Sequence, residues 1–179
     1  MMDHLEQVAK ICQTATGILL VDQRVLLIKH KKLGTWLSPG GHLEEGEFLH
    51  EAAEREFFEE TGLKVQAINP FTQDIDNQAL TGSVFQPTPI TINLHWVSES
   101  NYRARIAGQK KQDAVWANGC EQHLNFSFLV EPVAGLKFKQ NIEETDGIAW
   151  FSLAEVKAAQ PSLMFNSVKQ ELLLAFKLV

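Results

Sequence analysis

The 179-residue chain has only two cysteines and no long apolar run. Cys12 and Cys120 lack a Cys-x-x-Cys spacing, and two thiols in a chain of this size need no bridge. We therefore expect a reduced, cytoplasmic protein. The longest apolar stretches have the length of strands, and the first residues lack the basic start of a secretion signal. From these absences we expect no membrane span and no signal peptide.

An excess of positive charge is also missing. Lys and Arg number 16 against 22 Asp and Glu, which gives a formal net charge of -6. That balance argues against a surface that holds long nucleic acid by its phosphates. A small anionic substrate stays open, because a bound metal ion can reverse the local sign of charge. No repeat or linker divides the chain, so residues 1–179 are expected to form one domain, as a monomer or a homodimer.

Helical and strand patterns alternate along the chain. The polar segment 98–122 is long enough to indicate an excursion with a function or a mobile connection. The glycine- and proline-rich segment 31–46 must be largely loop. Strands are predicted at 14–21, 25–29, 65–71, 90–97, 124–130 and 148–151, and helices at 3–11, 47–61 and 162–178, with a helical turn at 152–156.

An acidic cluster on the helix predicted at 47–61 is the clearest chemical signal. Glu56, Glu59 and Glu60 share one helix face, because i,i+3 and i,i+4 positions are neighbours at about 3.6 residues per turn. The same stripe begins with apolar residues, so it is predicted to face the sheet. Carboxylates directed inward repel one another unless a cation lies among them, and Mg²⁺ prefers such oxygen ligands. A solvated acidic surface is the alternative, but it requires no glycine-rich approach and no arginine at a fixed spacing.

These residues resemble a known family motif. From Gly41 to Leu63 the sequence is similar to the Nudix box, GX5EX7REUXEEXGU, at all nine specified positions, with the bulky Phe57 at the first apolar one. The preceding WLSPGG resembles the W-x-x-P-G-G approach of many members. The resemblance covers Thr14 to about Val156. It implies an α/β fold, the Nudix α/β/α sandwich with a mixed β-sheet between helices.

The resemblance also implies an activity and its residues. A Mg²⁺-dependent enzyme, with Mn²⁺ as a substitute, would cut a phosphoanhydride bond in a nucleoside diphosphate linked to another moiety, such as a nucleoside triphosphate or a nucleotide sugar. Water would attack phosphorus, with Glu59 or Glu60 as the first candidate for the general base. Glu144 lies in the region where some relatives carry a distant catalytic glutamate, although a polar loop is the alternative. Arg55 would orient a carboxylate, and the metal ligands would be Glu47, Glu56, Glu59, Glu60 and the backbone near Gly41.

Candidates for substrate binding lie outside the box. His123 and Asn125 alternate along a predicted strand and share a face with Ser127, resembling the His-x-Asp/Asn strand that lines the pocket in some bacterial relatives. An exposed edge strand is the alternative. Arg24 in the first hairpin is a candidate for phosphate contact, and so is Arg103, which belongs to a basic cluster with Arg105, Lys110 and Lys111. Such charges are more often simply solvated.

The sequence does not identify the substrate. None of the family markers for ADP-ribose, dinucleoside polyphosphates or NADH stands out downstream of the box. An RNA 5'-end pyrophosphohydrolase would share the box but needs a broader basic surface than a net charge of -6 provides. A non-catalytic nucleotide sensor of the family would carry a degraded box and an added DNA-binding domain. The complete box therefore favours a hydrolase of small nucleotides.

Overall fold

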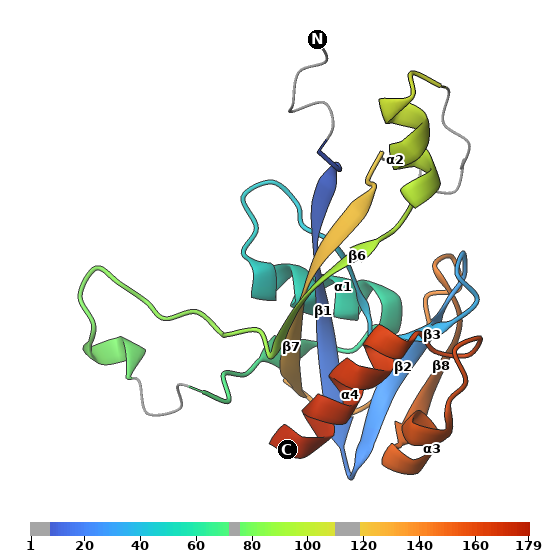
Figure 1. Cartoon of the computed structure of the whole chain (residues 1–179). Helices are drawn as coiled ribbons and strands as arrows, with labels where there is room; N and C mark the ends of the chain where they lie inside the picture. Colours follow the sequence, from blue (N-terminus) through green and yellow to red (C-terminus); the bar gives the residue numbers. More distant parts are fainter. Residues whose placement is uncertain (1–7, 72–75, 110–118) are drawn as a thin grey trace.

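The structure is a computed structural model that describes residues 8–71, 76–109 and 119–179. A mixed sheet lies between α1 on one face and α3 and α4 on the other (Figure 1). This arrangement confirms the predicted α/β class. Within the described residues, no helix is long and apolar enough to cross a membrane.

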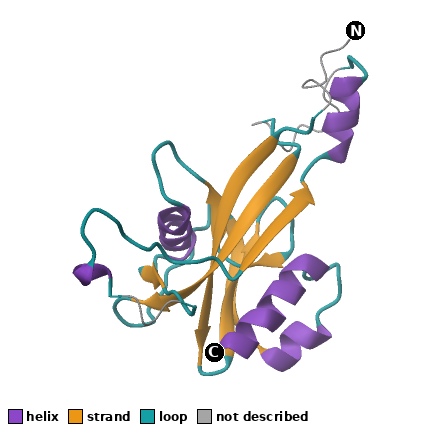
Figure 2. Cartoon of the chain, turned by 60° about the vertical axis from the view of Figure 1, so that its left-hand side comes forward, coloured by secondary structure: helices purple, strands orange, loops and turns teal. Residues whose placement is uncertain are grey.

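The elements follow the predicted order with added short pieces. Figure 2 shows helices on both sides of the strands. The helices are α1 (Leu49–Thr61), the 3₁₀ turn η2 (Asn77–Ala79), α2 (Glu99–Ile106), α3 (Leu153–Ala158) and α4 (Asn166–Leu178). The strands are β1 (Ile11–Val21), β2 (Arg24–His30), β3 (Trp36–Leu37), β4 (Gly40–His42), β5 (Val65–Ala67), β6 (Thr91–Trp96), β7 (Gln122–Pro132) and β8 (Thr145–Ser152).

The long strand β1 organises the sheet. It pairs in parallel with β7, from Ile11 opposite Gln122 to Leu19 opposite Val130. It also pairs antiparallel with β2 through the hairpin, and with β4 where Ala15 faces Gly41. Strand β6 continues the sheet beyond β7, and β8 pairs with β2. The glycine-rich strand β4 is therefore fixed to the middle of the fold.

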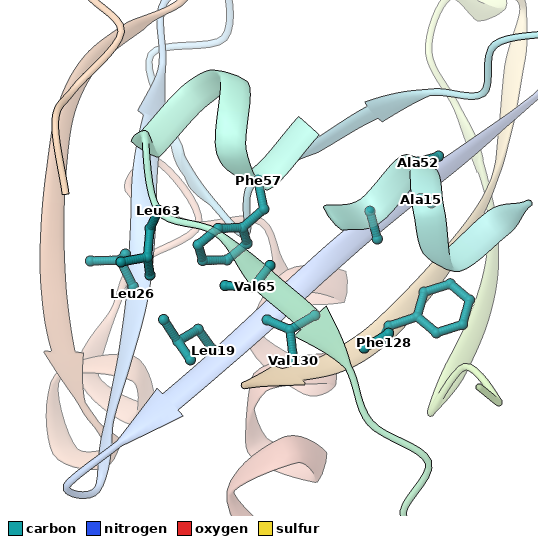
Figure 3. Close-up of a cluster of buried hydrophobic side chains, with 11 residues drawn as sticks. Ala15, Leu19, Leu26, Ala52, Phe57, Leu63, Val65, Phe128 and Val130 are labelled. Carbon is teal, nitrogen blue, oxygen red and sulfur yellow. The ribbon is translucent and has the colours of Figure 1, made fainter. Parts of the chain in front are cut away.

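Two apolar layers hold the helices against the sheet. Successive residues of β1 point to opposite faces, so Leu19 packs under α1 while Ile18 packs under α3 and α4. Phe57 of α1 is fully buried against Leu19 and Val130 (Figure 3). Gly17 explains why a phenylalanine fits there, since a Cβ at that glycine would lie 2.8 Å from the Phe57 ring. Burying a side chain of this size contributes roughly 2–3 kcal/mol, which anchors the acidic helix on the sheet.

The prediction that both cysteines stay reduced is wrong for this structure. Cys12 and Cys120 form a disulfide, with their Cα atoms 5.7 Å apart and 108 residues between them in sequence. The parallel pairing of β1 with β7 is the reason, because it aligns Cys12 with His123 while Cys120 lies just before β7. No local pattern carries this long-range register.

One further expectation is wrong, and two were incomplete. The helix predicted at 3–11 has no helical turn among its described residues, because Ile11 already pairs with β7. Strands β3 and β4 occur inside the segment predicted as loop, held by their pairing with β2 and β1. The segment 98–122 contains the helix α2, which Ser98 caps by accepting a hydrogen bond from the Asn101 backbone N–H at 3.2 Å.

Candidate metal and catalytic site

Helix α1 has clear start and stop signals. The Glu51 side chain accepts a hydrogen bond from the Phe48 backbone N–H at 3.0 Å, which fixes the first turn. Gly62 ends the helix in the left-handed conformation, with φ of 67°, and its N–H donates to the Phe58 carbonyl. The last two turns before this stop carry Glu56, Glu59 and Glu60.

Glu56 and Glu60 converge on the two glycines of β4. Glu60 is 4% exposed, and its Oε2 accepts a hydrogen bond from the Gly40 backbone N–H at 3.0 Å. A Cβ at Gly41 would lie 2.4 Å from the Glu56 carboxylate, so that carboxylate packs directly on the glycine backbone. Glycine is needed here because any side chain would occupy this space. We use the name acidic recess for the carboxylates of Glu56, Glu59 and Glu60 together with the adjoining backbone of β4.

Arg55 ties the carboxylates together. Its guanidinium donates to both oxygens of Glu47, at 2.9 and 3.0 Å. Its Nη1 donates to Glu56 at 2.9 Å and Glu59 at 3.1 Å, and its Nη2 also donates to the His42 carbonyl at 2.9 Å. The hydrogen bonds from Arg55 lower the pKa of Glu47, which therefore stays ionised. One arginine thus fixes the position of three carboxylates and of strand β4.

The acidic recess is electrostatically costly without a cation. Burial, together with the charges of Glu56, Glu144 and Glu59, raises the pKa of Glu60 to about 8, although the hydrogen bond from Gly40 opposes the rise. Burial is also the main cause that raises the pKa of Glu56. A divalent cation among these oxygens would remove the cost of gathering negative charge. The donor set, carboxylates beside a glycine backbone, fits the hard oxygen preference of Mg²⁺.

Glu144 reaches this site from a distant part of the chain. It precedes β8, and its backbone carbonyl accepts a hydrogen bond from the Lys31 N–H at 3.1 Å. Its charge contributes to the raised pKa values of both Glu56 and Glu60. The fold therefore places the Glu144 charge within electrostatic reach of Glu56 and Glu60, while its catalytic role stays a prediction.

His123 and Asn125 lie on the sheet beside β1. The Asn125 amide donates to Ser127 Oγ at 3.0 Å, which confirms the predicted shared face, and its oxygen accepts from Thr14 Oγ1 at 3.0 Å. The His123 ring centroid is 4.8 Å from that of His42. Burial lowers the pKa of His123 to about 4, so its imidazole is neutral at physiological pH. Their role in substrate binding stays a prediction.

The predicted phosphate contacts lie elsewhere. Arg24 pairs with Val21 at the hairpin end of β1, six residues from the Ala15 position that faces Gly41, or roughly 20 Å along the strand. Arg103 lies on α2 and donates to Glu99 at 2.6 Å with its side chain 74% exposed. The structure does not bring these arginines to the acidic recess. Lys110 and Lys111 of the same basic cluster lie outside the described residues.

Two acidic side chains that were not singled out from the sequence lie inside the fold, Glu121, which is 2% exposed, and the half-buried Glu171. Glu171 of α4 accepts a hydrogen bond from Ser127 Oγ at 3.2 Å, and burial raises its pKa to about 7. The signal was available, since Glu171 falls on the same helical stripe as Val168, Leu172 and Ala175. A charged residue on an apolar stripe indicates a carboxyl group held inside the fold.

Comparison with known proteins identifies relatives of the chain. A family model described as a NUDIX domain matches residues 11–173. The uncharacterized Nudix hydrolase YvcI of Bacillus subtilis (strain 168) is 42% identical over 53 residues, which is 30% of this chain and 32% of that protein. The m7GpppN-mRNA hydrolase NUDT17 of Xenopus laevis is 43% identical over 54 residues, 27% of this chain and 18% of that protein. The matches thus span less than a third of these curated relatives.

Similarity to solved structures extends over nearly the whole chain. The crystal structure of a hydrolase, NUDIX family from Clostridium perfringens, superposes with a TM-score of 0.68 and 24% identity, covering 93% of this chain and 96% of that chain. At this identity the likeness establishes the fold. It confirms the helix, mixed sheet and helix layers expected from the motif.

Proposed function

This chain belongs to the NUDIX family, and we propose that it hydrolyses a phosphoanhydride bond in a nucleoside diphosphate linked to another moiety. One observation supports this most strongly. The complete acidic motif is folded into a recess in which Glu56 and Glu60 meet the glycines of β4, with Arg55 bridging the carboxylates. A family member that had lost its activity would have no reason to retain this costly set of charges.

The residues of the recess have distinct tasks. Glu56, Glu59 and Glu60, with Glu47 and the backbone near Gly41, would hold Mg²⁺. The bound ion would polarise phosphoryl oxygens and lower the pKa of the attacking water. Arg55 holds the carboxylates of Glu47 and Glu56 in place, which keeps the site preorganised.

The general base must reach the attacking water beside the proposed metal ligands. Glu60 is covered by the Gly40 N–H and the sheet, which suits a ligand better than a base. The Glu59 side chain is 46% exposed and is the first candidate, with Glu144 as the second. A pH–rate profile of Glu59→Gln and Glu144→Gln separates them, because only loss of the base removes the rising limb.

The function is tested by a product-release screen with Mg²⁺. Its arms are nucleoside triphosphates, nucleotide sugars, ADP-ribose, dinucleoside polyphosphates, and triphosphorylated and capped RNA. At least one nucleoside diphosphate derivative should be hydrolysed, with activity lost in EDTA and restored by Mg²⁺ or Mn²⁺. Glu60→Gln should reduce turnover by on the order of 100-fold or more, while Glu131→Gln, an exposed glutamate of β7, should not. Metal-independent turnover, or none across the panel, would contradict the proposal.

The RNA arms test the second candidate. One relative is named as an m7GpppN-mRNA hydrolase, which gives a reason to include capped RNA. The net charge of -6 favours small nucleotides over long RNA. A cytoplasmic location, which we infer from the family and the sequence, would expose the Cys12–Cys120 bond to reduction.

A further inference from the structure

A second group of metal-ligand atoms lies outside the acidic recess. Cys12, Cys120 and His42 each place one ligand atom so that all three lie within 4.8 Å of one another. The Nε2 of His42 is 3.4 Å from the Sγ of Cys120. We call these three residues the thiol–imidazole cluster.

Three segments far apart in sequence build this cluster. In the sheet, β1 lies between β7, where Cys12 is opposite His123, and β4, where Thr14 is opposite His42. Cross-strand partners and residues two positions apart share a face, so the Cys12 and His42 side chains are on the same side of the sheet. Cys120 lies two residues before β7 and is 4% exposed. The cluster is thus held by the main strand pairings of the fold.

The spacing suits a tetrahedral ion. Ligand atoms on one Zn²⁺, with bonds of about 2.3 Å to sulfur and about 2.0 Å to nitrogen, lie about 3.5 Å apart. The separation of 3.4 Å between His42 and Cys120 already matches this value. Once the disulfide is opened, each sulfur can rotate about its Cα–Cβ bond to complete the arrangement. Thiolate and imidazole ligands select Zn²⁺ over Mg²⁺. The carboxylates of the recess instead suit Mg²⁺.

We propose that the reduced protein binds one Zn²⁺ ion through Cys12, Cys120 and His42. The fourth position is open to water or to the imidazole of His123, whose ring centroid lies 4.8 Å from that of His42. The site is separate from the acidic recess, and the inference does not rest on the proposed hydrolysis.

The oxidation state decides whether the site exists. A dithiol supplies two electrons and two protons to the Cys12–Cys120 bond and becomes a disulfide itself, leaving two thiols in the protein. Zn²⁺ then binds both sulfurs as thiolates, and two protons are released to the solvent. In the oxidised protein the sulfurs are bonded to each other and offer no thiolate.

The test uses Co²⁺ as a coloured substitute for Zn²⁺. The full chain is reduced with dithiothreitol, freed of reductant and metal without oxygen, and titrated with Co²⁺ in the presence of excess Mg²⁺. We expect thiolate-to-cobalt absorption in the near ultraviolet that saturates at one equivalent and disappears when one equivalent of Zn²⁺ is added. The oxidised protein should give no such absorption.

Variants assign the ligands. His42→Gln keeps the disulfide for purification, and after reduction it should bind Co²⁺ at least about tenfold more weakly. Cys12→Ser and Cys120→Ser should each lose most of the thiolate absorption. The matched control His50→Gln, a histidine of α1 outside the cluster, should bind as the wild type does.

Two outcomes would overturn the inference. Reduced wild type without thiolate-to-cobalt absorption would exclude the site, and His42→Gln with unchanged affinity would exclude the ligand set. Glu60→Gln separates this result from the proposed function, because it should lose hydrolysis and keep the cobalt spectrum. If the wild type hydrolyses nothing, the spectrum still decides the zinc site.

Discussion

Replacing Glu171 tests whether ionisation of this carboxyl group lowers the stability of the fold. Helix α4 buries Leu172 and Ala175 against the sheet, and Glu171 lies on the same side with its carboxyl at Ser127. Burial raises the pKa of Glu171 from the ordinary value of 4.5 to about 7. The folded protein therefore holds this proton more tightly than the unfolded chain does.

The sign of the effect follows from linkage. Glu171 costs least below about pH 4.5, where both states are protonated; the cost grows as pH rises from there to the folded pKa of about 7, and it levels off above that value. At about 1.4 kcal/mol per pKa unit, the cost to the free energy of unfolding is about 1 kcal/mol at pH 5 and about 3 kcal/mol at pH 8. Glu171→Gln removes this cost. The free energy of unfolding of the variant, relative to that of the wild type, should therefore rise by about 2 kcal/mol from pH 5 to pH 8.

The assay is thermal unfolding in EDTA from about pH 5 to pH 8. In a chain of this size, about 2 kcal/mol corresponds to a relative rise in the Tm of the variant of roughly 4–8 °C. A constant difference from replacing a carboxylic acid with an amide does not matter, because the slope with pH is the measured quantity. Glu131→Gln, on the exposed side of β7, should run parallel to the wild type. Parallel curves for Glu171→Gln would refute the reasoning and show that Glu171 is solvated or paired with a cation.

Two further predictions separate function from stability. Gly41→Ala should lower kcat/KM by on the order of 100-fold, because the added Cβ displaces the Glu56 carboxylate. The Tm should change little, since that carboxylate ends a flexible side chain. Normal turnover would show that the position of Glu56 is not critical. Arg105→Gln should reduce stability in urea by about 2–4 kcal/mol, because Arg105 donates to Glu121, whose side chain is 3% exposed. Arg103→Gln on the same helix should leave urea unfolding unchanged, because its partner is exposed; equal effects of the two variants would contradict the difference in burial.

The elements that sequence patterns predicted well are those stabilised locally. Helix α1 was predicted from residue 47 and begins at Leu49, because apolar spacing and the stop at Gly62 are contained in its own sequence. Strand β4 was missed, since its two glycines and histidine have no strand preference and pair only because β1 lies beside them. Helix α2 was missed because it is polar on most sides, although its Ser98 cap was visible.

In the site too, local spacing along the chain was predictable and contacts between distant segments were not. Spacing along one helix was enough to predict that Glu56, Glu59 and Glu60 gather on a single face. Contacts across the sheet were not predictable, because a register of pairing is set by the whole fold. The Cys12–Cys120 bond depends on that register.

Strand β4 separates two kinds of ligand by the alternation of its side chains. The Cα position of Gly41 faces Glu56, and the neighbouring His42 side chain points to the opposite face, where Cys120 lies 3.4 Å away. At β4, the carboxylates of Glu56 and Glu60 therefore lie on the α1 side, and the thiol–imidazole cluster lies on the other. Such segregation would let one short strand serve the proposed Mg²⁺ and Zn²⁺ sites without competition. The His42 carbonyl also accepts a hydrogen bond from Arg55 at 2.9 Å, so an ion bound by the His42 side chain would restrain the same arginine that orders the glutamates.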